Sequence, residues 1–183
     1  MSVNYIDTLV SFDLSHNRLG DGFNLEPLSH LTYLNLSGNS FSGNFESIGL
    51  RCGSINVLDL SFNKFTSLLG IEGFPRIKTF NISHNNLSGD ITALSKLQDI
   101  KYLDLSYNNI RDNIPNIPSS NLQYLNLSHN KLPNSTSIFE GIPKIIKELY
   151  VNYLTLFNVV NEYFRQIQPA VIVVKFNISL AHV

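Results

Sequence analysis

The chain has 183 residues, 43% of them hydrophobic and 15% charged, which is the composition of one folded domain and excludes wholesale disorder. Its formal net charge of −1 removes the long-range attraction to phosphate on which nucleic-acid-binding proteins rely. The single cysteine, Cys52, excludes an internal disulfide. We therefore expect packing alone to hold the fold together, and we expect no nucleic acid among its partners.

The N-terminal stretch MSVNYIDTLVSF lacks the basic region and the apolar core of a secretion signal. The most apolar run, Ala170–Val174, has five residues, against the roughly 20 that a membrane helix needs. We expect no direct membrane insertion by this chain. If the chain is complete as given, these features predict a cytoplasmic location.

One eleven-residue phrase, LxxLxLxxNxL, recurs along the chain. Six copies begin at Leu9, Leu31, Ile55, Ile77, Ile100 and Leu122. Their asparagines, which follow one another at intervals of 22 to 24 residues, are Asn17, Asn39, Asn63, Asn85, Asn108 and Asn130. A seventh copy begins at Ile146 and carries Leu154 in the asparagine position.

The phrase predicts its own local structure. Alternation at its centre has the two-residue period of a strand, so the fourth and sixth positions point into the core and their neighbours face water. The asparagine ends the strand, and its amide can satisfy backbone groups that the turn leaves unpaired. No unit buries its apolar face alone, so the repeats must stack into a solenoid.

The two ends of this solenoid are less regular than its middle. Only Val3, Tyr5 and Ile6 are available to cover the first repeat. Residues 158–167 place apolar side chains on one helical face, as a capping helix or as the convex segment of the seventh repeat. An eighth copy would use Val174 and Phe176. We expect a single solenoid over residues 1–183, with residues 157–183 as a C-terminal cap or a degenerate repeat.

The spacers between phrases carry a further motif: FSGNF after Asn39, LSGDI after Asn85 and IRDNIP after Asn108. These spacers resemble the LSGxIP continuation of the plant-type leucine-rich repeat, and the resemblance covers roughly Leu9 to Pro143. It implies an α/β fold, a curved right-handed coil with a parallel β-sheet on the concave face and loops or short helical turns on the convex face.

The resemblance also implies a function. Plant-type repeats belong mostly to receptor kinases, receptor-like proteins and secreted inhibitors, whose concave or lateral surface binds peptides, small hormones or proteins. It therefore implies a non-catalytic recognition module, a fragment or relative of a signalling receptor ectodomain, at the plasma membrane or outside the cell. The missing signal peptide and paired cysteines leave an alternative, an intracellular scaffold or enzyme-regulatory subunit with the same repeat.

Residues capable of chemistry do not converge. There is no glycine-rich phosphate loop, metal-binding cysteine pair or nucleophile elbow. His16, His84 and His129 share the eighth position of their phrases, but they are at least two repeats apart, roughly 10 Å, whereas zinc ligands lie near 2.0–2.3 Å from the metal. We expect no metal, no cofactor and no enzymatic activity.

Two further sets of side chains recur with the repeat. Asp and Asn alternate at the fifth position, and we expect them to be equivalent, solvated positions, too far apart to share a proton. Six glycosylation sequons begin at Asn35, Asn81, Asn86, Asn126, Asn134 and Asn177. In an exported protein, a glycoprotein, Asn86 and Asn134 would be the better acceptors.

The exposed strand positions of the late repeats favour a binding surface. One column of equivalent positions in successive repeats holds two tyrosines, and a second column holds aromatic rings from three repeats. Lysines flank these columns, Lys78 and Lys147 among them. Tyrosine provides a large contact area at little entropic cost. The candidate residues for a protein or peptide partner are Tyr102, Tyr107, Tyr124, His129, Tyr150, Tyr153 and Lys101. The alternative is that tyrosine is simply a good strand former on a solvated sheet.

Overall fold

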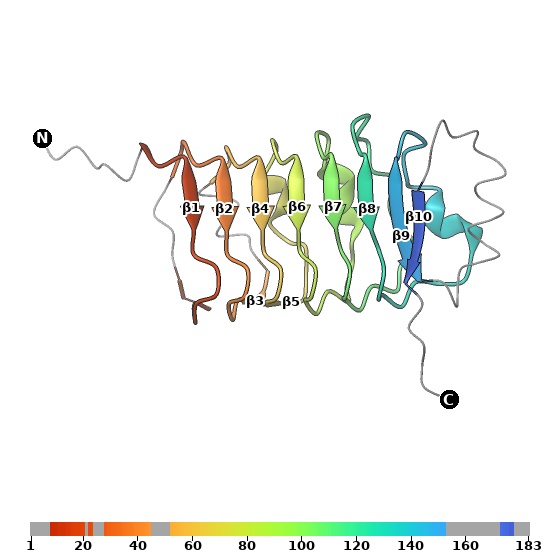
Figure 1. Cartoon of the computed structure of the whole chain (residues 1–183), viewed down its shortest axis with the longest axis horizontal. Coiled ribbons are helices and arrows are strands. Elements are labelled where there is room, and N and C mark those ends of the chain that lie inside the picture. The colour runs from red at the N-terminus through yellow and green to blue at the C-terminus, as the bar shows by residue number, and fades with distance from the viewer. Residues whose placement is uncertain (1–7, 21, 24–27, 45–51, 153–172, 178–183) are drawn as a thin grey trace, which may run out of the picture.

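The computed structural model describes residues 8–20, 22–23, 28–44, 52–152 and 173–177. Each repeat contributes one short strand, and these strands lie side by side in a parallel sheet (Figure 1). In sheet order the strands are β1 (Ser11–Asp13), β2 (Tyr33–Asn35), β4 (Val57–Asp59), β6 (Thr79–Asn81), β7 (Tyr102–Asp104), β8 (Tyr124–Asn126), β9 (Glu148–Asn152) and β10 (Val173–Asn177).

The strand register superposes equivalent positions of the phrase. Leu34 pairs with Leu58, Leu58 pairs with Phe80, and Phe80 pairs with Leu103. These four side chains are completely buried, because the alternating pattern turns them into the coil. The predicted leucine-rich-repeat solenoid is therefore confirmed.

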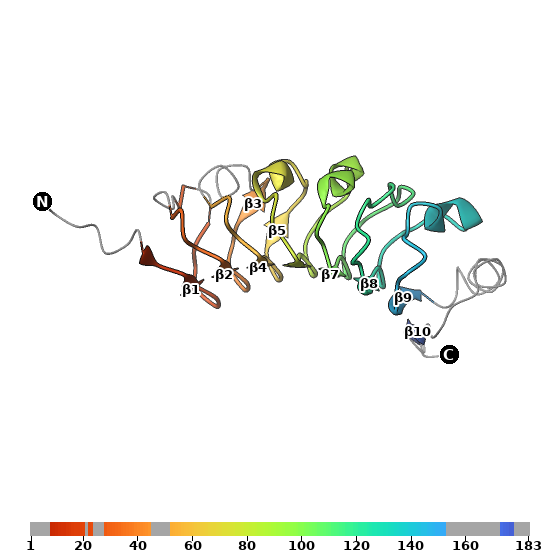
Figure 2. The same ribbon diagram turned by 90° about the horizontal axis from the view of Figure 1, so that it is seen from above.

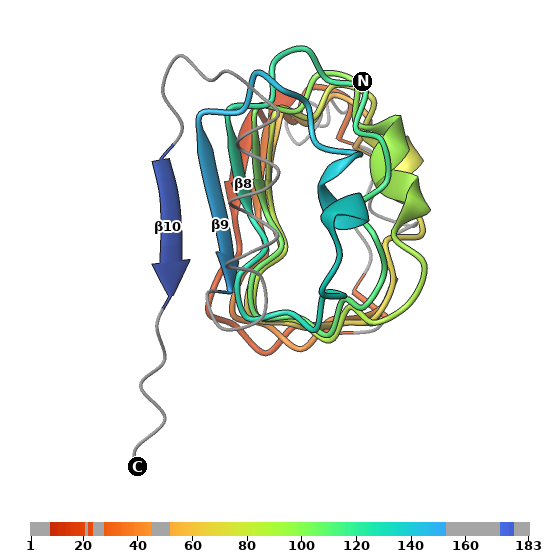
Figure 3. The ribbon, with the colours of Figure 1, turned by 90° about the vertical axis from the view of Figure 1, so that its right-hand side faces the viewer.

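The return path of each repeat runs on the opposite side of the coil. It carries short 3-10 helices, η2 (Ile71–Gly73), η3 (Thr92–Lys96) and η4 (Thr136–Phe139). Figure 3 shows the main sheet on one side of the coil and the helical turns on the other, and Figure 2 shows the sheet on the inner side of the curve. A second, two-stranded sheet joins β3 (Ser42–Gly43) to β5 (Lys64–Phe65).

The described parts of the two ends differ from the middle. At the N-terminal edge, Phe12 and Leu14 are only half-buried, whereas their equivalents Leu34 and Leu36 are fully buried. At the other edge, β10 pairs in parallel with β9, with Val174 opposite Leu149. This is the register expected of an eighth copy. The helix predicted over residues 158–167 lies outside the described residues, as do Val3, Tyr5 and Ile6.

Two of the general expectations can be compared with the described residues. Cys52 is fully buried in the core. No helix in the described part of the chain is both long enough and apolar enough to cross a membrane.

Candidate functional site

The phrase asparagines form a hydrogen-bonded ladder along the coil. The Nδ2 of Asn85 donates to the carbonyl of Leu60 in the preceding repeat at 2.9 Å, and to the carbonyls of Ile82 and Ser83 in its own turn. Its Oδ1 accepts the backbone N–H of Phe65 at 2.9 Å. The same arrangement recurs at Asn39, Asn63, Asn108 and Asn130. The ladder links the turns that follow β1, β2, β4, β6, β7 and β8.

Asn17 differs from the other ladder residues. It lies in the first repeat, and among the described residues its Nδ2 donates within its own turn, to the carbonyls of Leu14 and Ser15 at 3.0 Å. Its side chain is exposed, whereas Asn85 is buried. The ladder is therefore strongest inside the stack.

The acidic and amide side chains at the fifth position are paired instead of being independently solvated. Asn81 donates from Nδ2 to Asp59 at 3.2 Å, and Asp59 in turn accepts the backbone N–H of Ser61. Asn35 and Asn126 bind the preceding aspartate in the same way. The expectation of equivalent, solvated positions is wrong, because one strand spacing brings an amide within reach of the neighbouring carboxylate.

Beside this polar column lies the tyrosine column, which we define as Tyr102 on β7 and Tyr124 on β8. The two rings are parallel, with centroids 4.0 Å apart and an interplanar angle of 8°. Tyr150 on β9 tilts onto Tyr124, with a centroid distance of 5.1 Å, and its hydroxyl donates to Glu148. Three successive strands thus present phenol rings on one face.

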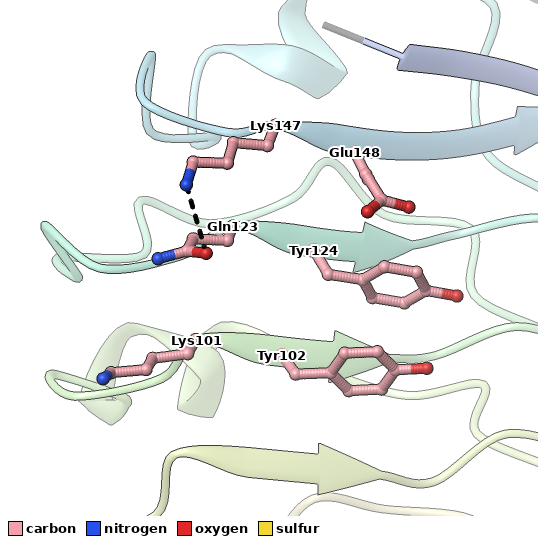
Figure 4. Close-up of a pocket in the computed structure, with 6 residues that line it drawn as sticks. All are labelled: Lys101, Tyr102, Gln123, Tyr124, Lys147 and Glu148. Carbon is pink, nitrogen blue, oxygen red and sulfur yellow. Dashed lines mark hydrogen bonds between the residues drawn. The ribbon is translucent and has the colours of Figure 1, made fainter.

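A hollow of about 470 Å³ opens along the tyrosine column (Figure 4). Both tyrosine side chains extend toward the carboxyl ends of their strands, while Lys101, Gln123 and Lys147 extend the opposite way. The lining is completed by Glu148. Lys147 donates to Gln123 at 3.4 Å, and Lys101 is exposed at the edge of the hollow. The hollow therefore combines flat apolar surface with ammonium groups at one end.

Burial changes the acidity of these phenols. Loss of solvation raises the pKa of Tyr102 and that of Tyr124 above their ordinary value of 10, and the negative charge of Asp104 acts in the same direction. Both hydroxyls therefore remain protonated at neutral pH. The two hydroxyls also interact with each other through a side-chain hydrogen bond, and neither adds charge to the surface.

A second aromatic array follows the carboxyl ends of the strands. We define the ring stack as Phe62, His84, Tyr107 and His129, which occupy the eighth position in four successive repeats. Their centroids are 4.0, 4.0 and 3.9 Å apart, at interplanar angles of 11–12°. All four have a left-handed backbone, with φ between 53° and 55°. This conformation repeats the same side-chain direction in each turn, so the rings lie face to face.

The histidines of the ring stack are held apart by a tyrosine. Tyr107 lies between His84 and His129, so the two imidazoles have no common ligand position. Burial lowers the pKa of His84 from its ordinary value of 6.5, and the nearby His129 acts in the same direction while Asp104 opposes it. Within the described residues, no group of three or more potential ligands could hold a metal ion.

The structure brings most of the candidate partner residues together. Tyr102, Tyr124 and Lys101 line the hollow, Tyr150 packs against Tyr124, and Tyr107 and His129 belong to the ring stack. Tyr153 lies outside the described residues. Phe62, His84, Gln123 and Glu148 were not among the predicted partner-binding residues. Comparing the whole eighth position, instead of its histidines alone, would have added Phe62 and placed His84 next to Tyr107.

Comparison with known proteins identifies the repeat. Models of leucine-rich repeats match residues 75–119, 30–50, 121–145 and 7–22. Rabbit lumican is 30% identical, with 81% of this chain and 93% of lumican covered. The chain is a leucine-rich-repeat protein. The matching models all describe leucine-rich repeats.

Other relatives of this leucine-rich-repeat protein are longer. The Arabidopsis thaliana serine/threonine-protein kinase BRI1-like 1 is 36% identical over 70% of this chain. The chain spans 12% of that kinase and 53% of human lumican, which is 32% identical. A solved plant peptide hormone receptor, RGFR1 in complex with RGF2, has a TM-score of 0.64 and 25% identity, covering 93% of this chain and 29% of the receptor.

Proposed function

We propose that this leucine-rich-repeat protein binds a protein or peptide segment on its concave face, in a receptor-type signalling role. The observation that carries the proposal is the tyrosine column, a pair of stacked, half-buried phenols beside a hollow. Tyrosine is enriched where proteins bind, because one side chain offers a broad apolar face and a polar tip. The ring stack extends this surface with Tyr107 and His129.

The charges around the hollow favour a particular orientation of the ligand. Lys101 and Lys147 lie at one end of the hollow and the phenol hydroxyls at the other. A segment with a carboxylate near the lysines would place its apolar side chains over the rings. The solved relative with 25% identity is a plant peptide hormone receptor in complex with RGF2, which supports a peptide as the ligand.

Glycosylation, if it occurs, would leave this face open. The amides of Asn35, Asn81 and Asn126 donate to carboxylates on the concave face, so a glycan there would disturb a hydrogen bond. Asn86 and Asn134 are exposed away from that column. These two asparagines are the acceptors we propose for an exported form.

The proposal is tested with peptides selected from a displayed random library against the immobilised protein. We expect Tyr124→Ala and Tyr102→Ala each to weaken binding of a selected peptide about tenfold or more, since central aromatic contacts contribute about 2 kcal/mol or more. Titration calorimetry gives the dissociation constants.

Tyr33→Ala is the matched control. Tyr33 occupies the same phrase position as Tyr102, three repeats away, and is also half-buried. We expect its loss to leave peptide affinity within twofold, and circular dichroism should show that all three variants fold. Equal losses for Tyr33 and Tyr124, or no effect of either late tyrosine, would contradict the proposed surface.

A further inference from the structure

Basic side chains form a column of their own at the amino ends of strands β6 to β9. We define the lysine column as the second position of the phrase in four successive repeats, Lys78, Lys101, Gln123 and Lys147. From the second member onward, the backbone N–H of each donates to the carbonyl of the member before it, at 2.8–3.0 Å. The four residues are therefore held in register, one strand spacing apart, and three of them carry a positive charge.

The lysine column makes this part of the surface positive. All four of its members are exposed, and Lys147 donates to the neighbouring Gln123 at 3.4 Å. The segments that lead into these four strands, 76–79, 99–102, 121–124 and 145–148, carry four basic residues and two acidic ones, in a chain with a net charge of −1. One of the two acidic residues, Glu148, accepts from the hydroxyl of Tyr150 on the tyrosine side. Charge complementarity therefore favours an acidic partner along the lysine column.

The lysine column and the tyrosine column run in parallel across the strands and present opposite chemistry. Figure 4 shows Lys101 and Lys147 extending away from the tyrosine rings, so the two sets of side chains diverge from the strand backbones. Members of both columns line the hollow of about 470 Å³. A ligand chain parallel to the strands would meet one member of each column, whereas a chain that crosses the strands can contact every member.

We propose that the ligand of this surface is an extended segment in which acidic and apolar residues alternate, and that it lies across strands β6 to β9. Alternate side chains of an extended chain point to opposite sides, so the acidic set faces the lysine column and the apolar set faces the tyrosine column. The inference rests on the proposed function, and it adds the sequence pattern of the ligand and the direction in which the ligand crosses the sheet.

The spacing of the two columns agrees with that of an extended chain. Lys78 and Lys147 are three strands apart, which is about 14 Å at about 4.8 Å per strand. Residues i and i+4 of an extended chain are about 13 Å apart, at about 3.3 Å per residue. Carboxylates at i, i+2 and i+4 therefore fall near the three lysines, and apolar side chains at i+1 and i+3 fall over Tyr102 and Tyr124.

The test compares two five-residue peptides of the same composition and charge, both acetylated and amidated so that they carry no terminal charge. One alternates, Asp-Leu-Asp-Leu-Asp, and the other does not, Asp-Asp-Asp-Leu-Leu. NMR titration of the 15N-labelled protein gives the dissociation constants from the amide shifts of Lys101 and Tyr124. We expect the alternating peptide to bind about fivefold more tightly or better, because only its order places all three carboxylates on one side.

Lys78→Gln is the decisive variant, because Lys78 belongs to the lysine column but not to the lining of the hollow. It should weaken binding of the alternating peptide about threefold or more. Lys64→Gln is the matched control, since Lys64 is an exposed lysine on β5, in the second sheet, and its loss should leave the affinity unchanged.

Equal affinity for the two peptides, no saturable binding of either, or equal effects of Lys78→Gln and Lys64→Gln would overturn the alternating acidic ligand. The proposed function would still stand if a peptide selected from the library loses affinity in Tyr124→Ala. Tighter binding by a heparin-derived tetrasaccharide that is insensitive to Tyr124→Ala would assign the lysine column to a sulfated polysaccharide, and would also overturn the inference.

Discussion

Replacing Asn85 with alanine tests whether the ladder holds the repeats together. The substitution removes four hydrogen bonds, but it does not affect the four backbone partners equally. Each of the three carbonyls that Asn85 binds keeps a second hydrogen-bond donor. The Leu60 carbonyl still accepts from the Asn63 side chain, and the Ile82 carbonyl still accepts from the Asn108 side chain. The Ser83 carbonyl still accepts from the backbone N–H of Phe62. The backbone N–H of Phe65, in contrast, loses the acceptor that Asn85 provides.

The cost follows from this inequality. A buried N–H that loses its acceptor costs about 1–3 kcal/mol, and each weakened carbonyl adds a fraction of a kcal/mol, so we expect Asn85→Ala to lose about 2–4 kcal/mol. Urea denaturation measures the free energy of unfolding. Amide hydrogen exchange should show faster exchange at Phe65 than in the wild type, because that N–H is the group most affected.

Asn17→Ala is the matched control, since Asn17 is exposed and, in the part of the chain that the structure describes, binds within its own turn. We expect it to cost less than about 1 kcal/mol. Asn85→Asp separates donor from acceptor, because the new carboxylate can accept from Phe65 but cannot donate to the three carbonyls while it is ionised. Equal costs for Asn85→Ala and Asn17→Ala, or unchanged exchange at Phe65, would refute the reasoning.

Two further predictions concern pH and close backbone packing. Because the pKa of His84 is lowered in the fold, the unfolded chain takes up its proton first, so stability is complete above about pH 6.5 and falls as the pH drops through and below that value. His84→Phe should keep the ring stack and should make the urea midpoint depend less on pH between pH 7.5 and 5.5. An unchanged pH dependence of the midpoint would show that His84 is not its cause. Gly141→Ala would drive a Cβ into the carbonyl oxygens of Ile114 and Pro115, and should cost about 2–4 kcal/mol by denaturation. Gly89→Ala, with open space around it, should change stability by less than about 0.5 kcal/mol, and similar costs for both would contradict the packing argument.

The core and the ladder were predictable because the period alone determines them. Once the phrase is aligned, Leu34, Leu58 and Leu103 must occupy equivalent positions in successive turns, and the register confirms that they do. The same alignment placed Tyr102 opposite Tyr124, which the structure pairs directly. Alignment of the repeats alone therefore predicts which residues lie opposite each other on adjacent strands, without any knowledge of side-chain conformation.

The ring stack was not predictable in the same way, because it depends on side-chain direction as well as on position. The sequence placed Tyr107 and His129 in one column, but a strand spacing of about 4.8 Å led us to treat His84 and His129 only as histidines roughly 10 Å apart. The left-handed backbone at this position turns Phe62, His84 and Tyr107 into contact, with centroids 4.0 Å apart. Rings of different residue types then form one array. Because the sequence was searched for one residue type at a time, Phe62, His84 and Tyr107 were not recognised as a single array of contacting rings.

The two polar columns of the coil join the repeats in different ways. The ladder asparagines of repeats two to six each bind the preceding repeat, so they join every neighbouring pair of these six repeats. At the fifth position, Asn81 donates back to Asp59, whereas among the described residues no hydrogen bond joins Asn35 to Asp59. This column therefore couples repeats in pairs, one with two, three with four and five with six. Alternation also keeps carboxylates off adjacent strands, where their repulsion would oppose the stacking that the ladder holds in place.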